Sequence, residues 1–266
     1  MDSMILGRYL PLDSFMHRAD PRAKIMAMLV FIIAIFLPAG WWGYGVLGAI
    51  VFVSVILSKV SISYIIKAMK PMMFMLVFLL IINCLVVRTG SIAFSIFGFD
   101  VYMNAITQTL YIVVRLTLMI SITTLLTATT KPLDLTLGIE DLLVPFKKIG
   151  VPAHEIAMMI SIALRFIPTL IEETQRIMKA QASRGVDFEE GKLMEKIRGI
   201  LSLIVPLFIS AFQRAEDLAN AMEARGYIPD RKRTRYKQLK MRGADYLMMF
   251  FSLLILASLI AGCIML

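Results

Sequence analysis

The sequence predicts an all-α integral membrane protein, and three observations support this fold class. Of the 266 residues, 59% are hydrophobic, against roughly 45–50% in an average soluble domain, and the mean hydropathy is +0.78. A soluble chain of this composition would expose large apolar patches, which soluble monomers avoid. The alternation of apolar and polar residues that marks an outer-membrane β-barrel is sparse. The spans are therefore predicted to be helices.

About five segments are apolar enough over a length close to the 20 residues that a spanning helix needs. They lie at Ile25–Trp42, Tyr44–Ser58, Met72–Val87, Asn104–Thr127 and Asp245–Leu266. The chain then divides into an N-terminal membrane region with four transmembrane helices (1–128), a charged helical domain (129–243) and a C-terminal transmembrane helix (244–266).

The basic residues predict the orientation of these spans. The N-terminal tail carries four of them (Arg8, Arg18, Arg22 and Lys24), whereas the first connection, residues 38–43, carries no charge. Residues 129–243 hold 19 Lys or Arg and 14 Asp or Glu. Because cytoplasmic segments are enriched in Lys and Arg, we expect the N-terminus and residues 129–243 to be cytoplasmic and the C-terminus to be external.

The charged domain is predicted to consist of amphipathic helices. They cover approximately Leu133–Lys148, Ala153–Arg184 and Lys192–Arg225, the last two with apolar residues at helical spacing. Pro168 and Pro206 lie inside these two helices, where a proline bends or breaks the helix, so we expect kinks. The apolar run Ile200–Phe212 has only 13 residues, which favours an interfacial helix over a sixth span.

The two long amphipathic helices end in similar sequences. The first reads Ala-Gln-Ala-Ser-Arg-Gly at residues 180–185, and the second reads Ala-Met-Glu-Ala-Arg-Gly at residues 221–226, 41 residues later. A glycine just past a helix end and a cation in the last turn are typical of ordinary C-caps. Two exposed arginines, each able to bind a carboxylate through a forked pair of donors, are equally typical of docking ends for a two-fold or pseudo-two-fold partner. The pattern alone leaves both interpretations open.

No catalytic, cofactor-binding or metal site is predicted. His154-Glu155 begins like a zinc-protease motif, but Met158 occupies the position of the second histidine ligand. No GxxxxGK[ST] phosphate-binding loop occurs in the sequence. Arg115 is a charge within a predicted span, and we expect a structural partner for it, either Asn83 or a backbone carbonyl. The basic cluster at residues 231–237 is explained by anionic lipid headgroups, without nucleic acid.

Two further segments carry a family resemblance. The opening Asp-Ser-Phe-Met-His-Arg-Ala-Asp-Pro-Arg-Ala-Lys at residues 13–24 resembles the N-terminal signature of the transmembrane T-component (EcfT) of energy-coupling factor (ECF) transporters. Ala-Leu-Arg-Phe-Ile-Pro at residues 163–168 resembles the same family, and so do the two arginine-glycine ends. The resemblance covers nearly the whole chain, and Ala19, where leucine is expected, is one departure from it.

The resemblance implies a non-catalytic coupling subunit in a bacterial or archaeal cytoplasmic membrane. Two ABC-type ATPase subunits (EcfA and EcfA′) are then the partners of the two helix ends, which are formed by Ser183, Arg184, Gly185, Ala224, Arg225 and Gly226. A separate substrate-binding S-component is the partner in the membrane, and its movement serves the uptake of vitamins or trace nutrients. Pro168 and Pro206 then shape the coupling helices. A permease of another ABC importer and, further from the pattern, an intramembrane enzyme are the alternatives.

Overall fold

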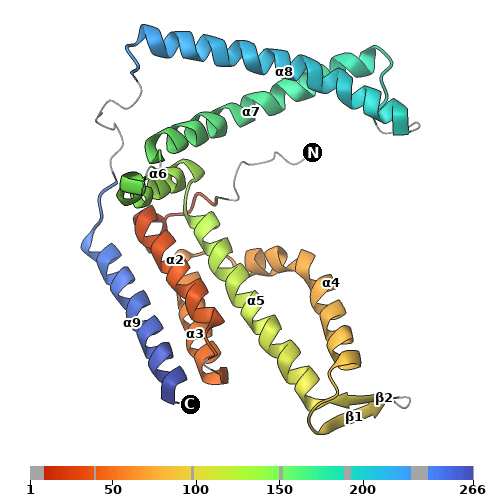
Figure 1. Ribbon diagram of the computed structural model, residues 1–266, viewed down its shortest axis with the longest axis vertical. Coiled ribbons are helices and arrows are strands. Elements are labelled where there is room, and N and C mark those ends of the chain that lie inside the picture. The colour runs from red at the N-terminus through yellow and green to blue at the C-terminus, as the bar shows by residue number, and fades with distance from the viewer. Residues whose placement is uncertain are drawn as a thin grey trace. The chain divides into compact units, whose positions relative to one another are not determined.

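The computed structural model describes residues 9–38, 40–96, 99–149, 152–188, 193–228 and 239–265. They form two compact units, Met1–Ala157 with Leu239–Leu266, and Met158–Gln238. The elements are α1 (Phe15–Arg18), α2 (Pro21–Phe36), α3 (Gly40–Ser58), α4 (Ile62–Val86), β1 (Ile92–Ile96), β2 (Phe99–Tyr102), α5 (Met103–Thr129), α6 (Pro132–Leu143), the 3₁₀ helix η1 (Val144–Ile149), α7 (Ala153–Ser183), α8 (Leu193–Ala224) and α9 (Gly243–Met265) (Figure 1).

The predicted all-α integral membrane protein is confirmed, but the set of long apolar helices differs from the predicted one. Among the described residues, five helices are long and apolar enough to cross a membrane: α3, α4, α5, α9 and, unexpectedly, α7 from His154 to Ser183. The predicted first span, Ile25–Trp42, is wrong at its end. α2 stops at Phe36 after 16 residues, because the following Leu37 precedes a proline, which disfavours helical backbone. Trp42 belongs to α3.

A short hairpin between α4 and α5 was not predicted. Strands β1 and β2 pair antiparallel, with Ser95 opposite Asp100 and Ile96 opposite Phe99 (Figure 1). The hairpin occupies part of the connection that sequence analysis treated only as a link between two spans. Apart from it, the described elements are helical.

Helices α2, α3, α5 and α9 supply most of the apolar core of the first unit, and α4 adds Ile65. The most deeply buried side chains of this core include Ile35, Leu47 and Leu259, which are 0–2% exposed. α4 packs along α5 but presents most of its apolar surface outward, with Phe74 83% exposed. In a membrane protein such a surface faces lipid or a partner, because hydrocarbon imposes no penalty on it.

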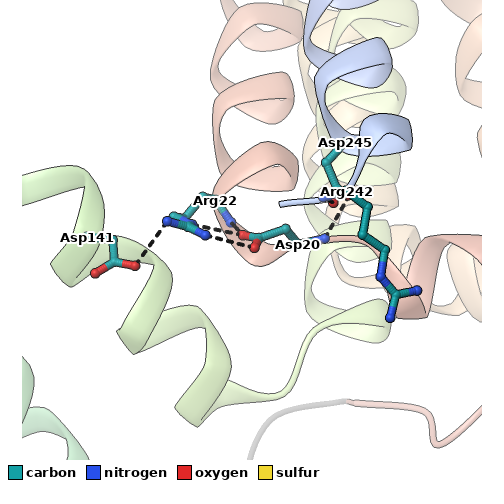
Figure 2. A network of polar contacts seen from close by, with 5 residues as sticks. All are labelled: Asp20, Arg22, Asp141, Arg242 and Asp245. Atoms are coloured by element: carbon teal, nitrogen blue, oxygen red, sulfur yellow. Dashed lines mark hydrogen bonds and ion pairs between the residues drawn. The ribbon is translucent and has the colours of Figure 1, made fainter. Parts of the chain in front are cut away.

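A buried carboxylate joins the starts of α2 and α9. Asp245, 2% exposed, accepts the backbone N–H of Arg242 at 2.7 Å and that of Asp20 at 2.9 Å (Figure 2). The first bond is half of a capping box, in which an acidic side chain at the third helical position reaches back to the N-cap amide. The second bond crosses to the N-cap residue of the other helix. One side chain therefore satisfies amides at two helix N-termini.

Arg22 continues this network toward α6. Its guanidinium binds Asp20, with Nε–Oδ1 and Nη2–Oδ2 distances of 3.1 Å, and its Nη1 lies 3.3 Å from Oδ2 of Asp141 (Figure 2). The backbones come close at Gly138, where a Cβ atom would lie 3.1 Å from Cβ of Pro21. The lack of a side chain at this position thus allows α6 to pack on the start of α2.

Lys24 joins α2 to the end of α5. The residue is 7% exposed, and its Nζ donates to the carbonyl of Thr129 at 3.1 Å and to Oγ1 of Thr130 at 3.2 Å. A cation at a helix C-terminus binds carbonyls that have no partner within the helix and interacts favourably with the helix dipole. Lys24 therefore caps α5 from another helix.

The partner of Arg115 differs from the two that were expected. Its Nε and Nη2 both donate to Oη of Tyr44, at 3.1 and 2.9 Å, and its Cζ lies 5.4 Å from the centre of the Phe36 ring. Asn83 instead donates to Thr109 at 3.0 Å. The expected Asn83 or backbone carbonyl is therefore wrong, because the core packing turns Arg115 toward the aromatic ends of α2 and α3 and Asn83 toward its own neighbour on α5.

In the second unit, α7 and α8 run in opposite directions and are joined by polar side chains (Figure 1). Glu173 accepts Oγ–H of Ser210 at 2.6 Å and pairs with Nη2 of Arg214 at 2.5 Å. Further toward the end of α7, Gln181 donates to the carbonyl of Ser202 at 3.2 Å. The large apolar side chains of α8 remain exposed, including Phe208 and Phe212.

Replacing Asp245 by alanine is expected to destabilise the first unit. The change leaves the Asp20 amide without its acceptor in a buried position, and such an unsatisfied group costs about 1–3 kcal/mol. Thermal unfolding in detergent checks this, with Asp217→Ala on the exposed surface of α8 as the control. Equal unfolding temperatures for the two variants would contradict the capping role of Asp245.

Removing the Tyr44 hydroxyl is expected to leave the Arg115 charge without its hydrogen-bond acceptor. A hydrogen bond to a charged group contributes about 1.5–3 kcal/mol, so Tyr44→Phe should lower the unfolding temperature in detergent by several degrees. The matched control is Tyr111→Phe, because Tyr111 belongs to the same aromatic cluster and stacks on Trp41 at 4.2 Å. A loss in the control as large as in Tyr44→Phe would assign the effect to ring packing.

Candidate docking ends of α7 and α8

α7 ends in a regular C-cap. The amide of Gly185 donates to the carbonyl of Ala182 at 3.0 Å, and that of Val186 donates to Gln181 at 3.1 Å. This pair of bonds defines a Schellman motif, with Arg184 as the C-cap residue. Gly185 has φ +85°, a left-handed conformation that glycine adopts without steric cost.

α8 ends in the same way. Gly226 donates to Glu223 at 2.8 Å, and Tyr227 donates to Met222 at 2.9 Å. Gly226 has φ +73°, and Arg225 is the C-cap residue. The sequence repeat thus encodes one backbone structure twice, with an arginine at the same position in each copy.

The caps account for the two glycines but not for the two arginine side chains. The backbone groups at each end are satisfied by backbone bonds, and both arginines are exposed. Within the described part of the chain, neither the Arg184 nor the Arg225 guanidinium has a hydrogen-bond or ion-pair partner. Each end therefore presents five free donors in a planar fork, a geometry that matches a carboxylate.

The residues before the arginines are small and exposed. Ser183 donates its hydroxyl to the carbonyl of Lys179 at 3.0 Å, which folds the side chain against its own helix. Ala224, the equivalent residue in α8, has only a methyl group and is also exposed. Small side chains here leave space for another surface to approach the arginine.

The two prolines do not interrupt their helices. α7 continues from Ala153 through Pro168 to Ser183, and α8 continues from Leu193 through Pro206 to Ala224. The kinks expected at Pro168 and Pro206 remain a prediction.

The N-terminal motif forms a local structure within the first unit. Arg18 binds Asp13 through Nε and Nη2 at 2.8 and 2.6 Å, and this hydrogen-bonded guanidinium lowers the pKa of the Asp13 carboxyl below its usual value. Ser14 caps α1, and its Oγ lies 2.7 Å from Nδ1 of His17. The pKa of His17 is lowered, mainly because the imidazole is partly buried. These contacts fix the backbone that leads into α2.

His154, which opens the zinc-protease-like sequence, lies against a carboxylate. Its Nδ1 is 2.9 Å from Oε1 of Glu140, a residue that is 4% exposed. The contact joins the start of α7 to α6 within the first unit.

Sequence reasoning missed the residues that join α7 to α8, namely Glu173, Ser210 and Arg214. A signal was available in the sequence, because Glu173 and Arg214 have opposite charges and are separated by the same 41 residues as Arg184 and Arg225. This spacing alone does not indicate a contact, because the contact depends on how the two helices pack.

The sequence is similar to known transport proteins. The sequence profile of the CbiQ family, described as "Cobalt transport protein", matches residues 13–236. The energy-coupling factor transporter transmembrane protein EcfT of Bacillus subtilis (strain 168) is 46% identical over 98% of both chains. Those of Lactococcus lactis subsp. cremoris (strain MG1363) and Listeria innocua serovar 6a are each 44% identical, over 93% and 98% of both chains. With a full-length match at this identity, the chain belongs to the EcfT family of transmembrane components of energy-coupling factor transporters.

Proposed function

We propose that this chain is the coupling subunit that links ATP hydrolysis by two ABC-type ATPase subunits, EcfA and EcfA′, to the movement of a substrate-binding S-component. The observation that carries the proposal is the pair of exposed, unpartnered arginines at the matching ends of α7 and α8. Two equivalent ends suit two homologous partners, because a repeated docking element fits a partner with two-fold or pseudo-two-fold symmetry.

Each end is suited to a groove with acidic side chains. Arg184 and Arg225 supply the charged fork, Gly185 and Gly226 turn the chain away directly after it, and Ser183 and Ala224 keep the approach open. A desolvated arginine–carboxylate pair at an interface has a large effect on affinity, since truncating one partner costs about 2–5 kcal/mol. The list of docking residues is thus Ser183, Arg184, Gly185, Ala224, Arg225 and Gly226.

The proposed orientation places the N-terminus in the cytoplasm and the C-terminus outside. Under it, residues 129–243 form the cytoplasmic coupling domain, although α7 is long and apolar enough to be a candidate span. Six charged residues favour an interfacial position for α7: Glu155, Arg165, Glu172, Glu173, Arg176 and Lys179. α3, a typical span, contains none, and a charge at the bilayer centre costs about 2.5–3.5 kcal/mol on insertion scales.

Anionic lipids are the proposed contact of the basic cluster at residues 231–237, which lies outside the described residues. About 1 kcal/mol per basic residue near a negatively charged leaflet supports this role. We propose no nucleic-acid partner, since lipid headgroups explain the charge.

The exposed apolar surface of α4 is the proposed place for the S-component. Phe74 and Val86 are 83% and 71% exposed, and a helix with so little burial offers a broad surface to another membrane protein. The transported compound, a vitamin or trace nutrient, is then bound by the S-component, and this chain has no catalytic role. Hydrolysis takes place in the ATPase subunits.

The runner-up is a permease of a different ABC importer, for which one coupling helix per chain is expected. The two interpretations differ in the number of ends that matter: both arginines in the coupling subunit, one in the permease. An intramembrane enzyme, the other alternative, requires neither of them.

Reversing both charges is expected to abolish ATPase binding. We expect Arg184→Glu with Arg225→Glu to release both ATPase subunits in a pull-down from cells that co-express them, and each single change to weaken binding at least about tenfold, or 1.4 kcal/mol. Arg184→Lys with Arg225→Lys should give an intermediate loss, because lysine keeps the charge but not the planar fork.

The control is Lys67→Glu with Lys70→Glu, which makes the same change in net charge at exposed positions of α4, in the first unit. If the Arg184→Glu, Arg225→Glu variant binds the ATPase subunits as well as the wild type does, the two arginines are ordinary C-cap residues and the docking proposal is wrong. Loss with Arg184→Glu alone, and none with Arg225→Glu, would favour the permease.

A further inference from the structure

The polar contact between α7 and α8 lies at the same distance from both proposed docking ends. Glu173 is eleven residues before Arg184, and Arg214 is eleven residues before Arg225. At a rise of 1.5 Å per residue, each arginine lies about 16 Å along its helix from this contact. The ion pair thus joins equivalent positions of the two similar helix ends. We call Glu173 and Arg214 the crossing pair.

The two arginines extend in opposite directions from the crossing pair. Going along α7, the contacts with α8 pass to lower residue numbers: Glu173 meets Ser210 and Arg214, whereas Gln181 meets Ser202. The helices are therefore antiparallel where they meet (Figure 1). A slip of one helix along the other would therefore change the separation of the two ends.

Leu203 and Leu207 of α8 are half-buried, and polar bonds add a directional constraint on this register. The side chains of Glu173 and Arg214 are 23% and 29% exposed, and among the described residues of α8 only Gly199 is buried. Both carboxylate oxygens of Glu173 are used, one by Ser210 and one by Arg214. The Arg214 guanidinium also lies 5.9 Å from the centre of the Phe166 ring. Directional bonds of this kind specify a register, whereas apolar contacts alone tolerate sliding.

We propose that the crossing pair, with Ser210, is a positioning device that sets the separation of Arg184 and Arg225 so that both can engage their partners at once. The inference rests on the proposed docking function of the two ends. The gain is in avidity, because two linked contacts bind far more tightly than either alone only when their geometry allows simultaneous engagement. As a partly exposed ion pair, the crossing pair adds little to overall stability.

Two spin labels measure the proposed separation directly. They are placed by Ala180→Cys and Ala221→Cys, which are exposed and equivalent positions near the two ends, in a full-length chain carrying Cys84→Ser and Cys263→Ser. We expect Glu173→Gln to broaden the distance distribution measured by pulsed electron paramagnetic resonance, or to shift it by up to one helical turn, about 5 Å. Glu172→Gln, an exposed neighbour, is the matched control and should leave the distribution unchanged.

Exchange of the two charges tests the pair itself. Glu173→Arg with Arg214→Glu should restore the wild-type distribution, and each single change should not. In pull-downs, Glu173→Gln should weaken binding of the paired ATPase subunits at least fivefold without lowering the unfolding temperature, and the exchange should recover binding. Ser210→Ala, which removes one bond to Glu173, should broaden the distribution less than Glu173→Gln.

An unchanged distribution in Glu173→Gln would overturn the inference, and so would a changed distribution accompanied only by a lower unfolding temperature, with binding intact. A failure of the docking proposal gives a different result. The Arg184→Glu, Arg225→Glu variant would then bind the ATPase subunits at the wild-type level, while Glu173→Gln would still change the spin-label distance distribution.

Discussion

The ends of helices leave backbone amides and carbonyls without partners, and in a membrane protein few water molecules are available to satisfy them. In the first unit, Asp245 satisfies several of these groups, because its carboxylate accepts hydrogen bonds from backbone amides at the starts of both α2 and α9. Lys24 does the equivalent for the end of α5. Since α2 takes part in both contacts, its N-terminal residues fix the relative positions of three helices, and Arg22 adds α6.

In the second unit, the carbonyls at the ends of α7 and α8 are satisfied by the backbone rather than by side chains. The ends of α7 and α8 are closed by backbone bonds alone, which leaves Arg184 and Arg225 free of any structural task. Arg115 and Arg214 have the opposite environment: the first is held by Tyr44 and the second by Glu173. Arginines with a partner inside the chain therefore hold the fold, whereas arginines without one are available to another protein. The proposed docking function follows from this difference, and the proposed register of α7 and α8 gives the free pair a defined separation.

The local parts of this architecture could be predicted from the sequence. Hydropathy alone places four of the five predicted spans on α3, α4, α5 and α9, although Val87 lies one residue past the end of α4 and Leu266 lies outside the described residues. The Ala-x-x-small-Arg-Gly repeat predicts two glycine C-caps that the structure confirms. Both signals depend on residues within a few helical turns of one another. The end of α2 was missed, although Pro38 marks it, because an apolar run continues across the turn into Trp41 and Trp42.

What the sequence determined by itself is therefore the class of the protein, most of its helices, the backbone form of the two arginine ends and the family resemblance of its motifs. Only the tertiary structure decided which polar groups meet: Asp20 with Asp245, Arg115 with Tyr44 rather than Asn83, and Glu173 with Arg214. The physical reason is that spacing along the chain fixes a side chain's own helix face, whereas its partner depends on how separate helices pack. The exposure of Arg184 and Arg225 also depends on the tertiary structure, because a side chain is known to lack a partner only once all its neighbours are known.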